Sequence, residues 1–274
     1  MKNNIFSFIL LLITLLACDS GIPKEKEKQV EKVIEKQDQL YKPLVISGVT
    51  RINIGQGEEK QESSIAYSYY QLNDKSFRYE EEINNYLSES ISTDFEQKSK
   101  QKIKYDLSPD HFHALLKNFK KECEEYGEES PWNLYDSTFI DETFEQFIQV
   151  ERTNYIFSGG AHGNSYSENI LFSRETGEKL KLKDFISDIP KLTKIGDKYF
   201  RKVAEIEPAD NLEEQGFWFT NGFQLNGNFY FDATNLVFVY NQYEIGPYSM
   251  GIIFVKIPIR EIKSILKIDV KRLK

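Results

Sequence analysis

The strand-like segments in the second half of the chain constrain its fold more than any other feature. From residue 143 onward, short aromatic-rich segments with alternating apolar and polar residues are separated by turn residues, a pattern typical of half-buried strands. The stretch 175–178 (ETGE) between two such segments predicts a hairpin. Helical patterns lie mostly elsewhere. This segregation predicts an α+β fold of antiparallel sheets with packed helices, in two closely associated parts.

The individual elements follow from local pattern. Residues 43–55 and 63–72 read as strands joined by a polar hairpin connection, and amphipathic spacing predicts helices over 77–95 and from Ser108 to about 126. Further along, a short helical turn should precede a helix beginning near Pro190, and Pro258 should open a terminal helix. Short strands are expected within 223–240 and 251–258.

The first residues indicate export. Lys2 precedes an uncharged apolar stretch over 5–17, which is too short for a comfortable membrane span and fits a signal peptide. The Leu15–Leu16–Ala17–Cys18 sequence resembles the lipobox of bacterial lipoproteins. That resemblance implies cleavage after residue 17 and a membrane anchor on Cys18, facing the periplasm or the exterior. An ordinary secretory signal is the alternative. The Lys- and Glu-rich stretch 18–42 reads as a charged tether.

Charge narrows the classes of partner. The chain has 35 basic and 43 acidic residues, a net charge of −8. Lys2 is the only charged residue among 1–17, so removal of this segment would leave 34 basic residues and a net charge of −9. Such a chain has no electrostatic reason to bind nucleic acid and favours a basic partner. The chain has two cysteines, and lipidation of Cys18 would leave Cys123 as the single thiol, so no internal disulfide is expected. Cys123 itself has the spacing of a buried helical residue.

Residues 155–164 (YIFSGGAHGN) resemble a site. Gly159, Gly160 and Gly163 permit positive φ or close approach of another group, and His162 could serve as ligand, acid or base. Three interpretations stay open: a tight corner whose histidine bonds loop backbone, a partner contact, or catalysis. Catalysis needs a nearby carboxylate such as Glu244, or a hydroxyl. The segment lacks the usual serine-nucleophile and phosphate-loop patterns.

A second candidate stretch is 243–248 (YEIGPY). Glu244 could bind a basic partner or pair with His162, although Gly and Pro in the stretch are also ordinary turn residues. No cofactor and no metal site is expected. His111 and His113 stand two residues apart on a helix, so they cannot hold one metal ion from a single face.

Both stretches resemble the RsiV-like extracytoplasmic domain of bacteria, with Thr176–Gly177, Leu180, Asp184 and Phe185 between them at similar spacing. Upstream, 43–48 (PLVISG) and 83–87 (INNYL) resemble the noncatalytic N-terminal domain of the deacetylase PdaC. These resemblances cover roughly residues 43–267. They imply an N-terminal α+β domain over 43–142 and a C-terminal one over 143–274.

The resemblance implies little about the function of this chain. RsiV-like proteins are anti-sigma factors whose outer domain binds lysozyme, but this chain has the lipobox where they have a sigma-binding segment and a membrane span. The deacetylase activity of PdaC belongs to a separate metal-dependent domain. We therefore expect a lipid-anchored binding or sensing module for lysozyme-like proteins or cell-wall fragments. The alternatives are an envelope hydrolase or deacetylase using His162, and a structural envelope lipoprotein. The candidate contact residues are Gly159, Gly160, His162, Gly163, Tyr243, Glu244 and Tyr248.

Overall fold

The computed structural model describes residues 44–54, 61–72, 78–81, 83–86, 131–157 and 159–271, together with 110, 113, 114, 117, 118, 120 and 121. Residues 43–274 form one compact unit. The predictions for the signal peptide, Cys18, the tether, His111 and Cys123 lie outside the described residues. Within the described part of the chain, no helix is long and apolar enough to cross a membrane.

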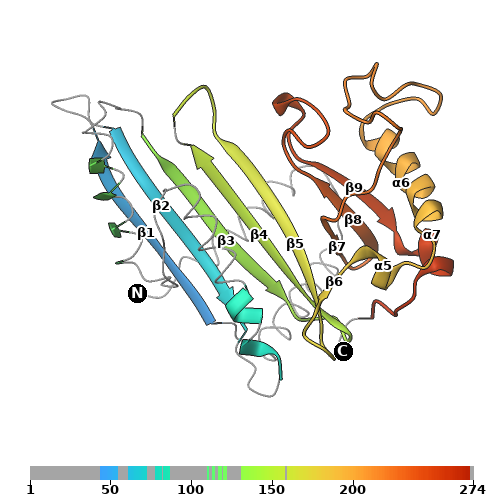
Figure 1. Cartoon of the computed structure of the whole chain (residues 1–274), viewed down its shortest axis with the longest axis horizontal. Helices are drawn as coiled ribbons and strands as arrows, with labels where there is room; N and C mark the ends of the chain where they lie inside the picture. The colour runs from blue at the N-terminus through green and yellow to red at the C-terminus, as the bar shows by residue number, and fades with distance from the viewer. Residues whose placement is uncertain are drawn as a thin grey trace, which may run out of the picture. The chain divides into compact units, whose positions relative to one another are not determined.

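A six-stranded sheet runs through the described chain in sequence order, from blue β1 to yellow β5 and β6 in Figure 1. Its strands are β1 (Leu44–Ile54), β2 (Gln61–Gln71), β3 (Asn133–Asp141), β4 (Phe147–Phe157), β5 (Asn164–Ser173) and β6 (Lys179–Leu180). The predicted hairpins β1–β2 and β5–β6 are confirmed. The sheet is nevertheless mixed, because β2 and β3 are parallel. Parallel neighbours need a long crossover connection, here residues 72–132.

Alternate residues along the strands point to opposite faces of this sheet. The helix face carries buried apolar side chains, and Ile83 and Tyr86, from the helical residues 83–86, pack against them. It also buries an ion pair, in which the Arg152 guanidinium donates to Asp136 from Nε at 3.1 Å and from Nη2 at 2.6 Å. The other side, called the open face below, carries Tyr135, Gln149 and Tyr155.

A second layer packs on the open face beside β4 and β5. It consists of a three-stranded antiparallel sheet in the order β7-β8-β9 with short helices around it. The elements are α5 (Leu182–Phe185), α6 (Ile189–Val203), β7 (Phe229–Phe231), β8 (Asn235–Tyr240), η1 (Tyr248–Met250), β9 (Ile253–Pro258), α7 (Ile259–Ile262) and η2 (Lys263–Ile265). The expected helix near Pro190 and the strands on either side of 232–234 are confirmed.

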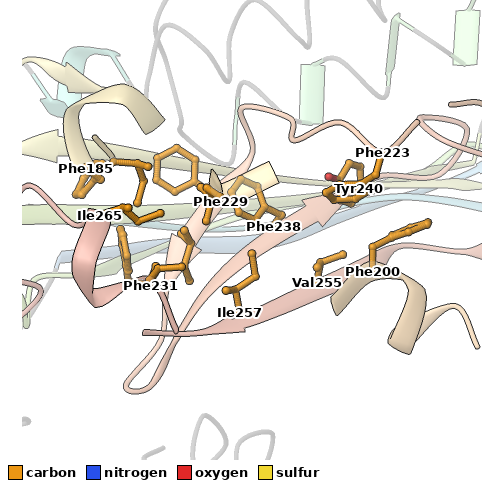
Figure 2. Packing of buried hydrophobic residues seen from close by; sticks show 14 of the residues in the cluster. Phe185, Phe200, Phe223, Phe229, Phe231, Phe238, Tyr240, Val255, Ile257 and Ile265 are labelled. Atoms are coloured by element: carbon orange, nitrogen blue, oxygen red, sulfur yellow. The ribbon is translucent and has the colours of Figure 1, made fainter. Parts of the chain in front are cut away.

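Phenylalanine rings fill the space between the two layers (Figure 2). Phe147 of β4 packs edge-on against Phe185 of α5, with ring centroids 5.2 Å apart. The rings of Phe185 and Phe231 lie 5.1 Å apart, so the core continues into β7. Aromatic pairs at such distances add to the stabilisation from buried apolar area. The α+β class predicted from the sequence is therefore confirmed, with one aromatic core joining both sheets.

Side-chain amides continue the hydrogen bonding where the two sheets meet. Gln149 of β4 donates from Nε2 to the Phe231 carbonyl (2.9 Å) and accepts at Oε1 from the Phe231 N–H (2.6 Å). It therefore bonds the edge of β7 as a neighbouring strand would. Along the edge of β5, Asn241 Oδ1 accepts from the Ser167 N–H, and Asn228 Oδ1 accepts from the Asn169 N–H. We call these side chains the amide bridges.

The boundary suggested at 142/143 falls between β3 and β4. These strands pair along the whole of β3, from Asn133 opposite Phe157 to Asp141 opposite Gln149. The ion pair of Asp136 with Arg152 also joins them. The two predicted parts therefore share one sheet.

Candidate functional site

The loop between β4 and β5 is called the GGAHG loop (159–163), and two glycines form its turn. Gly159 has φ 95° and Gly160 has φ 90°, values that side chains with a β-carbon rarely adopt. The loop closes a hairpin in which Ile156 pairs with Asn164. The structural interpretation of these glycines is thus confirmed, since both supply the backbone conformation of the turn.

Gly163 has a different role in the same loop. Its φ is not positive, but a β-carbon at this position would overlap the ring of Tyr155. Tyr155 lies on the open face of β4 and is 40% exposed. Gly163 therefore allows the loop to rest directly on a tyrosine ring. The first and the ninth residue of the stretch 155–164 are therefore in direct contact.

His162 lies at the exposed tip of the GGAHG loop. Its Nδ1 is 3.1 Å from the Gly163 carbonyl oxygen, which can only accept, so Nδ1 carries a proton. In the neutral ring Nε2 is then an acceptor, and the Tyr243 hydroxyl lies 3.4 Å away in position to donate to it. The imidazole also stacks on Tyr248, with ring centroids 3.6 Å apart and planes 16° apart.

The two candidate stretches therefore meet in space. Tyr243 and Tyr248, from the YEIGPY loop (243–248), contact His162 and lie 5.6 Å from each other by ring centroid. We call His162, Tyr243 and Tyr248 the aromatic cluster. Tyr243 is 50% exposed, and its backbone has φ 64°, in the left-handed region. A bulky residue in that region is strained, and such strain concentrates at functional sites.

Glu244 does not join the aromatic cluster. Its Oε1 accepts a hydrogen bond from Asn226 Nδ2 at 2.7 Å, and its Oε2 accepts from the Asn241 N–H at 2.8 Å. Asn226 Nδ2 also donates to the Val239 carbonyl, so the pair fixes the YEIGPY loop to the end of β8. Among the described residues, no hydrogen bond or ion pair links Glu244 to His162. The sequence-based pairing of these two residues is therefore not formed.

The base of the YEIGPY loop is also firmly held. Gln242 Oε1 accepts from the Ser165 N–H of β5 at 2.8 Å, and the buried Tyr240 hydroxyl donates to the Gln224 carbonyl at 2.7 Å. Burial, reinforced by the nearby Glu244 carboxylate, raises the pKa of Tyr240. That phenol therefore stays neutral and serves as a fixed donor.

Chemically, the aromatic cluster offers rings and hydroxyls. Among the residues that the structure describes, no three His, Cys, Asp or Glu side chains gather as metal ligands would. His162 has a phenol and a backbone carbonyl as its polar neighbours. Such a surface suits contact with a partner through tyrosines, which are common in the energetically important parts of interfaces.

Sequence reasoning missed the residues that bring the loops together. The amide bridges Gln149, Asn228 and Asn241, with Gln242 beside them, fix the second layer against β4 and β5. The available signal was the density of Asn and Gln around two strongly apolar strands in 224–242.

Residues 181–260 match the family model DUF3298, which is described as a protein of unknown function. This segment is a DUF3298 domain. It contains the YEIGPY loop, while the GGAHG loop lies upstream of the matched residues. No curated protein matches the chain.

Two solved structures share the fold around the DUF3298 domain. A DUF3298 family member from Bacteroides fragilis has a TM-score of 0.65 at 17% identity, covering 82% of this chain and 94% of its own. A DUF3298 family protein from Pseudomonas aeruginosa has a TM-score of 0.56 at 15% identity, covering 85% and 99% respectively. The likeness extends well beyond residues 181–260, so the DUF3298 domain and the upstream strands belong to one shared architecture.

Proposed function

We propose that this chain is a lipid-anchored extracytoplasmic binding module that captures a basic, lysozyme-like protein through the aromatic cluster. The observation that carries the proposal is the meeting of the two loops in one exposed group of rings. The resemblance to RsiV-like and PdaC-type domains supplies the partner class. The net charge of −8 supports it, because an acidic surface steers a basic protein toward contact.

The geometry of the aromatic cluster favours binding over hydrolysis. A general base needs an orienting group and a reacting group within hydrogen-bond reach. The Glu244 carboxylate is occupied by Asn226 and Asn241, and the phenol of Tyr243 lies at the long distance of 3.4 Å from His162. An envelope hydrolase or deacetylase using His162 is therefore the less supported alternative.

Calorimetric titration of the purified full-length chain with lysozyme tests the proposal. We expect micromolar or tighter binding at low salt that weakens as salt is added, because screening shortens the reach of the acidic surface. Tyr243→Ala should weaken the affinity by roughly tenfold or more, as truncation of a central interface tyrosine does. Undetectable binding at low salt would remove the lysozyme-like partner from the proposal.

A matched control is Phe254→Ala. Phe254 is an aromatic residue of β9 that is 41% exposed and lies outside the aromatic cluster. We expect it to leave lysozyme affinity unchanged. An equal loss of affinity in both variants would mean that the aromatic cluster is not the contact surface.

The anchor is tested separately. We expect the chain to fractionate with membranes and to carry covalently bound acyl chains, which give stable attachment. Cys18→Ser should abolish acyl labelling. Labelling that persists in this variant would exclude Cys18 as the lipid attachment point.

A further inference from the structure

The second layer covers only part of the open face of the six-stranded sheet. Open-face residues of β4 and β5 beneath it are buried, as in Phe147, Gln149 and Leu171. Toward β1 the same face is exposed, with Val49 51% and Tyr135 44% accessible. Large apolar side chains in such an exposed group on a sheet mark a contact surface.

These exposed side chains form a row across the strands. Val49 pairs with Ala66, Ala66 with Tyr135, and Tyr135 with Tyr155. Residues paired in register point to the same face and repeat at the strand spacing of about 4.8 Å. We call this set, from β1 to β4, the apolar row. It presents two adjacent tyrosine rings.

A second row of hydroxyl groups runs parallel to the apolar row. Its members are the register partners Ser47, Ser68, Ser137 and Thr153, none of which is fully buried. The row lies two residues further along each strand, about 7 Å away. The Ser137 and Thr153 hydroxyls are 2.8 Å apart and hydrogen-bonded. Each hydroxyl oxygen can accept two hydrogen bonds and donate one, so this hydroxyl row keeps capacity for a ligand.

The apolar and hydroxyl rows differ from the aromatic cluster in the class of ligand that their lack of charge favours. Neither row contains an acid or a base other than the tyrosine phenols. On the same face, Arg51 is paired with Glu62 at 3.3 Å, and Glu151 lies beyond Thr153 on β4. A basic protein would gain little electrostatic attraction along the rows, whereas a neutral polyhydroxylated ligand matches both. Tyrosine rings offer apolar faces to sugar rings, and hydroxyls bond to hydroxyls.

We infer that the apolar and hydroxyl rows form a flat binding face for a neutral β-linked glycan chain, such as a polymer of N-acetylhexosamine. The chain would lie across the strands, so that successive sugars meet successive strands. Tyr135 and Tyr155 would stack on sugar rings while the hydroxyl row bonds sugar oxygens. This inference does not depend on the aromatic cluster, although Tyr155 borders both surfaces through its contact with Gly163.

The test titrates the full-length chain with the hexamer of N-acetylglucosamine. We expect measurable binding that Tyr135→Ala weakens by about fivefold or more, because one stacked ring is lost. Tyr135→Phe, which keeps the ring, should stay within about twofold of the unchanged chain. Because Tyr135 is exposed, the alanine variant should fold, and its thermal unfolding midpoint checks this. Phe254→Ala on β9 is the control aromatic.

Three outcomes would overturn the inference. One is absence of hexamer binding at millimolar concentration, and another is equal binding by Tyr135→Ala and the unchanged chain. The third is a change of oligomeric state in Tyr135→Ala, because the face would then contact a second copy. The two proposals fail separately, since Tyr135→Ala should retain lysozyme binding and Tyr243→Ala should retain hexamer binding.

Discussion

At the scale of single residues, Gly160 and Gly163 are required for different structural reasons. Gly160 supplies a positive φ and has open space around the position of a β-carbon. Gly163 has ordinary backbone but lies against the Tyr155 ring. The same residue type thus serves conformation in one case and close packing in the other. Substitution of each glycine by alanine can distinguish the conformational role from the packing role.

Gly163→Ala should lower the free energy of unfolding by about 1–3 kcal/mol, because the added methyl overlaps the Tyr155 ring. Adding Tyr155→Ala should restore much of this loss in a double-mutant cycle measured by chemical denaturation. Gly160→Ala is the control. Its cost arises from φ alone, so Tyr155→Ala should not relieve it. Equal relief in both cases would contradict the packing role of Gly163.

Tyr243 permits a second residue-scale prediction. Asparagine tolerates its φ of 64° better than tyrosine does. We expect Tyr243→Asn to keep the free energy of unfolding within about 1 kcal/mol of the unchanged chain, or to raise it. Lysozyme binding should still weaken. A larger loss of stability, seen in the same denaturation experiment, would show that the tyrosine ring mainly holds the loop.

At the scale of elements, the amide bridges connect strands that no backbone ladder joins. Gln149 satisfies both polar groups of Phe231, although it is 82 residues away in sequence. It is 6% exposed, so water cannot readily replace it. Buried backbone groups that lose their partners carry a full desolvation cost. The second layer should therefore depend strongly on this side chain.

Gln149→Leu should lower the free energy of unfolding by roughly 2–4 kcal/mol, because it leaves the Phe231 N–H and carbonyl without their partner. Hydrogen exchange at the Phe231 amide should accelerate as well. Gln146→Leu is a matched control, since Gln146 is exposed. Unchanged exchange at Phe231 in Gln149→Leu would show that other contacts hold β7 in place.

Local elements could be predicted from the sequence, whereas their distant partners could not. The turn at 175–178 and the cap and proline near residue 190 are encoded within a few residues. The parallel pairing of β2 with β3 depends on a connection of residues 72–132, which no short pattern specifies. Likewise, His162 and Tyr243 were each candidates, but their contact spans 81 positions. The hydrogen bonds that engage the exposed Glu244 with Asn226 and Asn241 had no local signal.

At the scale of the whole molecule, the six-stranded sheet carries the apolar and hydroxyl rows and contributes His162 to the aromatic cluster, whose two tyrosines come from the second layer. β1 to β4 present the apolar and hydroxyl rows, and the hairpin of β4 and β5 carries the GGAHG loop. The ion pair of Asp136 and Arg152, with side chains 2% and 5% exposed, ties β3 to β4 within this sheet. Breaking such a buried pair is costly, because one charge is left without a partner.

Separating the chain at 142/143 should therefore destroy cooperative folding. Expressed alone, 143–274 loses the β3 partner of β4, and 43–142 loses the partner of β3. We expect neither half to show a sharp thermal unfolding transition, while the full-length chain unfolds residues 43–274 in a single one. Calorimetry of the three proteins measures this. A sharp transition in either half would establish that it is an independent domain.

Asn226, which fixes the YEIGPY loop, also occupies a position where a chemical change would have a structural consequence. Asn226 is followed by Gly227, and an asparagine before an unhindered glycine is the sequence most open to spontaneous loss of its amide nitrogen. In this reaction the Gly227 backbone nitrogen attacks the Asn226 side-chain carbonyl and expels ammonia, and water then opens the cyclic imide to isoaspartate or aspartate. Either product carries a carboxylate in place of the amide whose Nδ2 now donates to Glu244 and to the Val239 carbonyl. Two donated hydrogen bonds would become repulsion between acceptors. Slow chemical damage at this one position would thus loosen the aromatic cluster while leaving the sheet face intact.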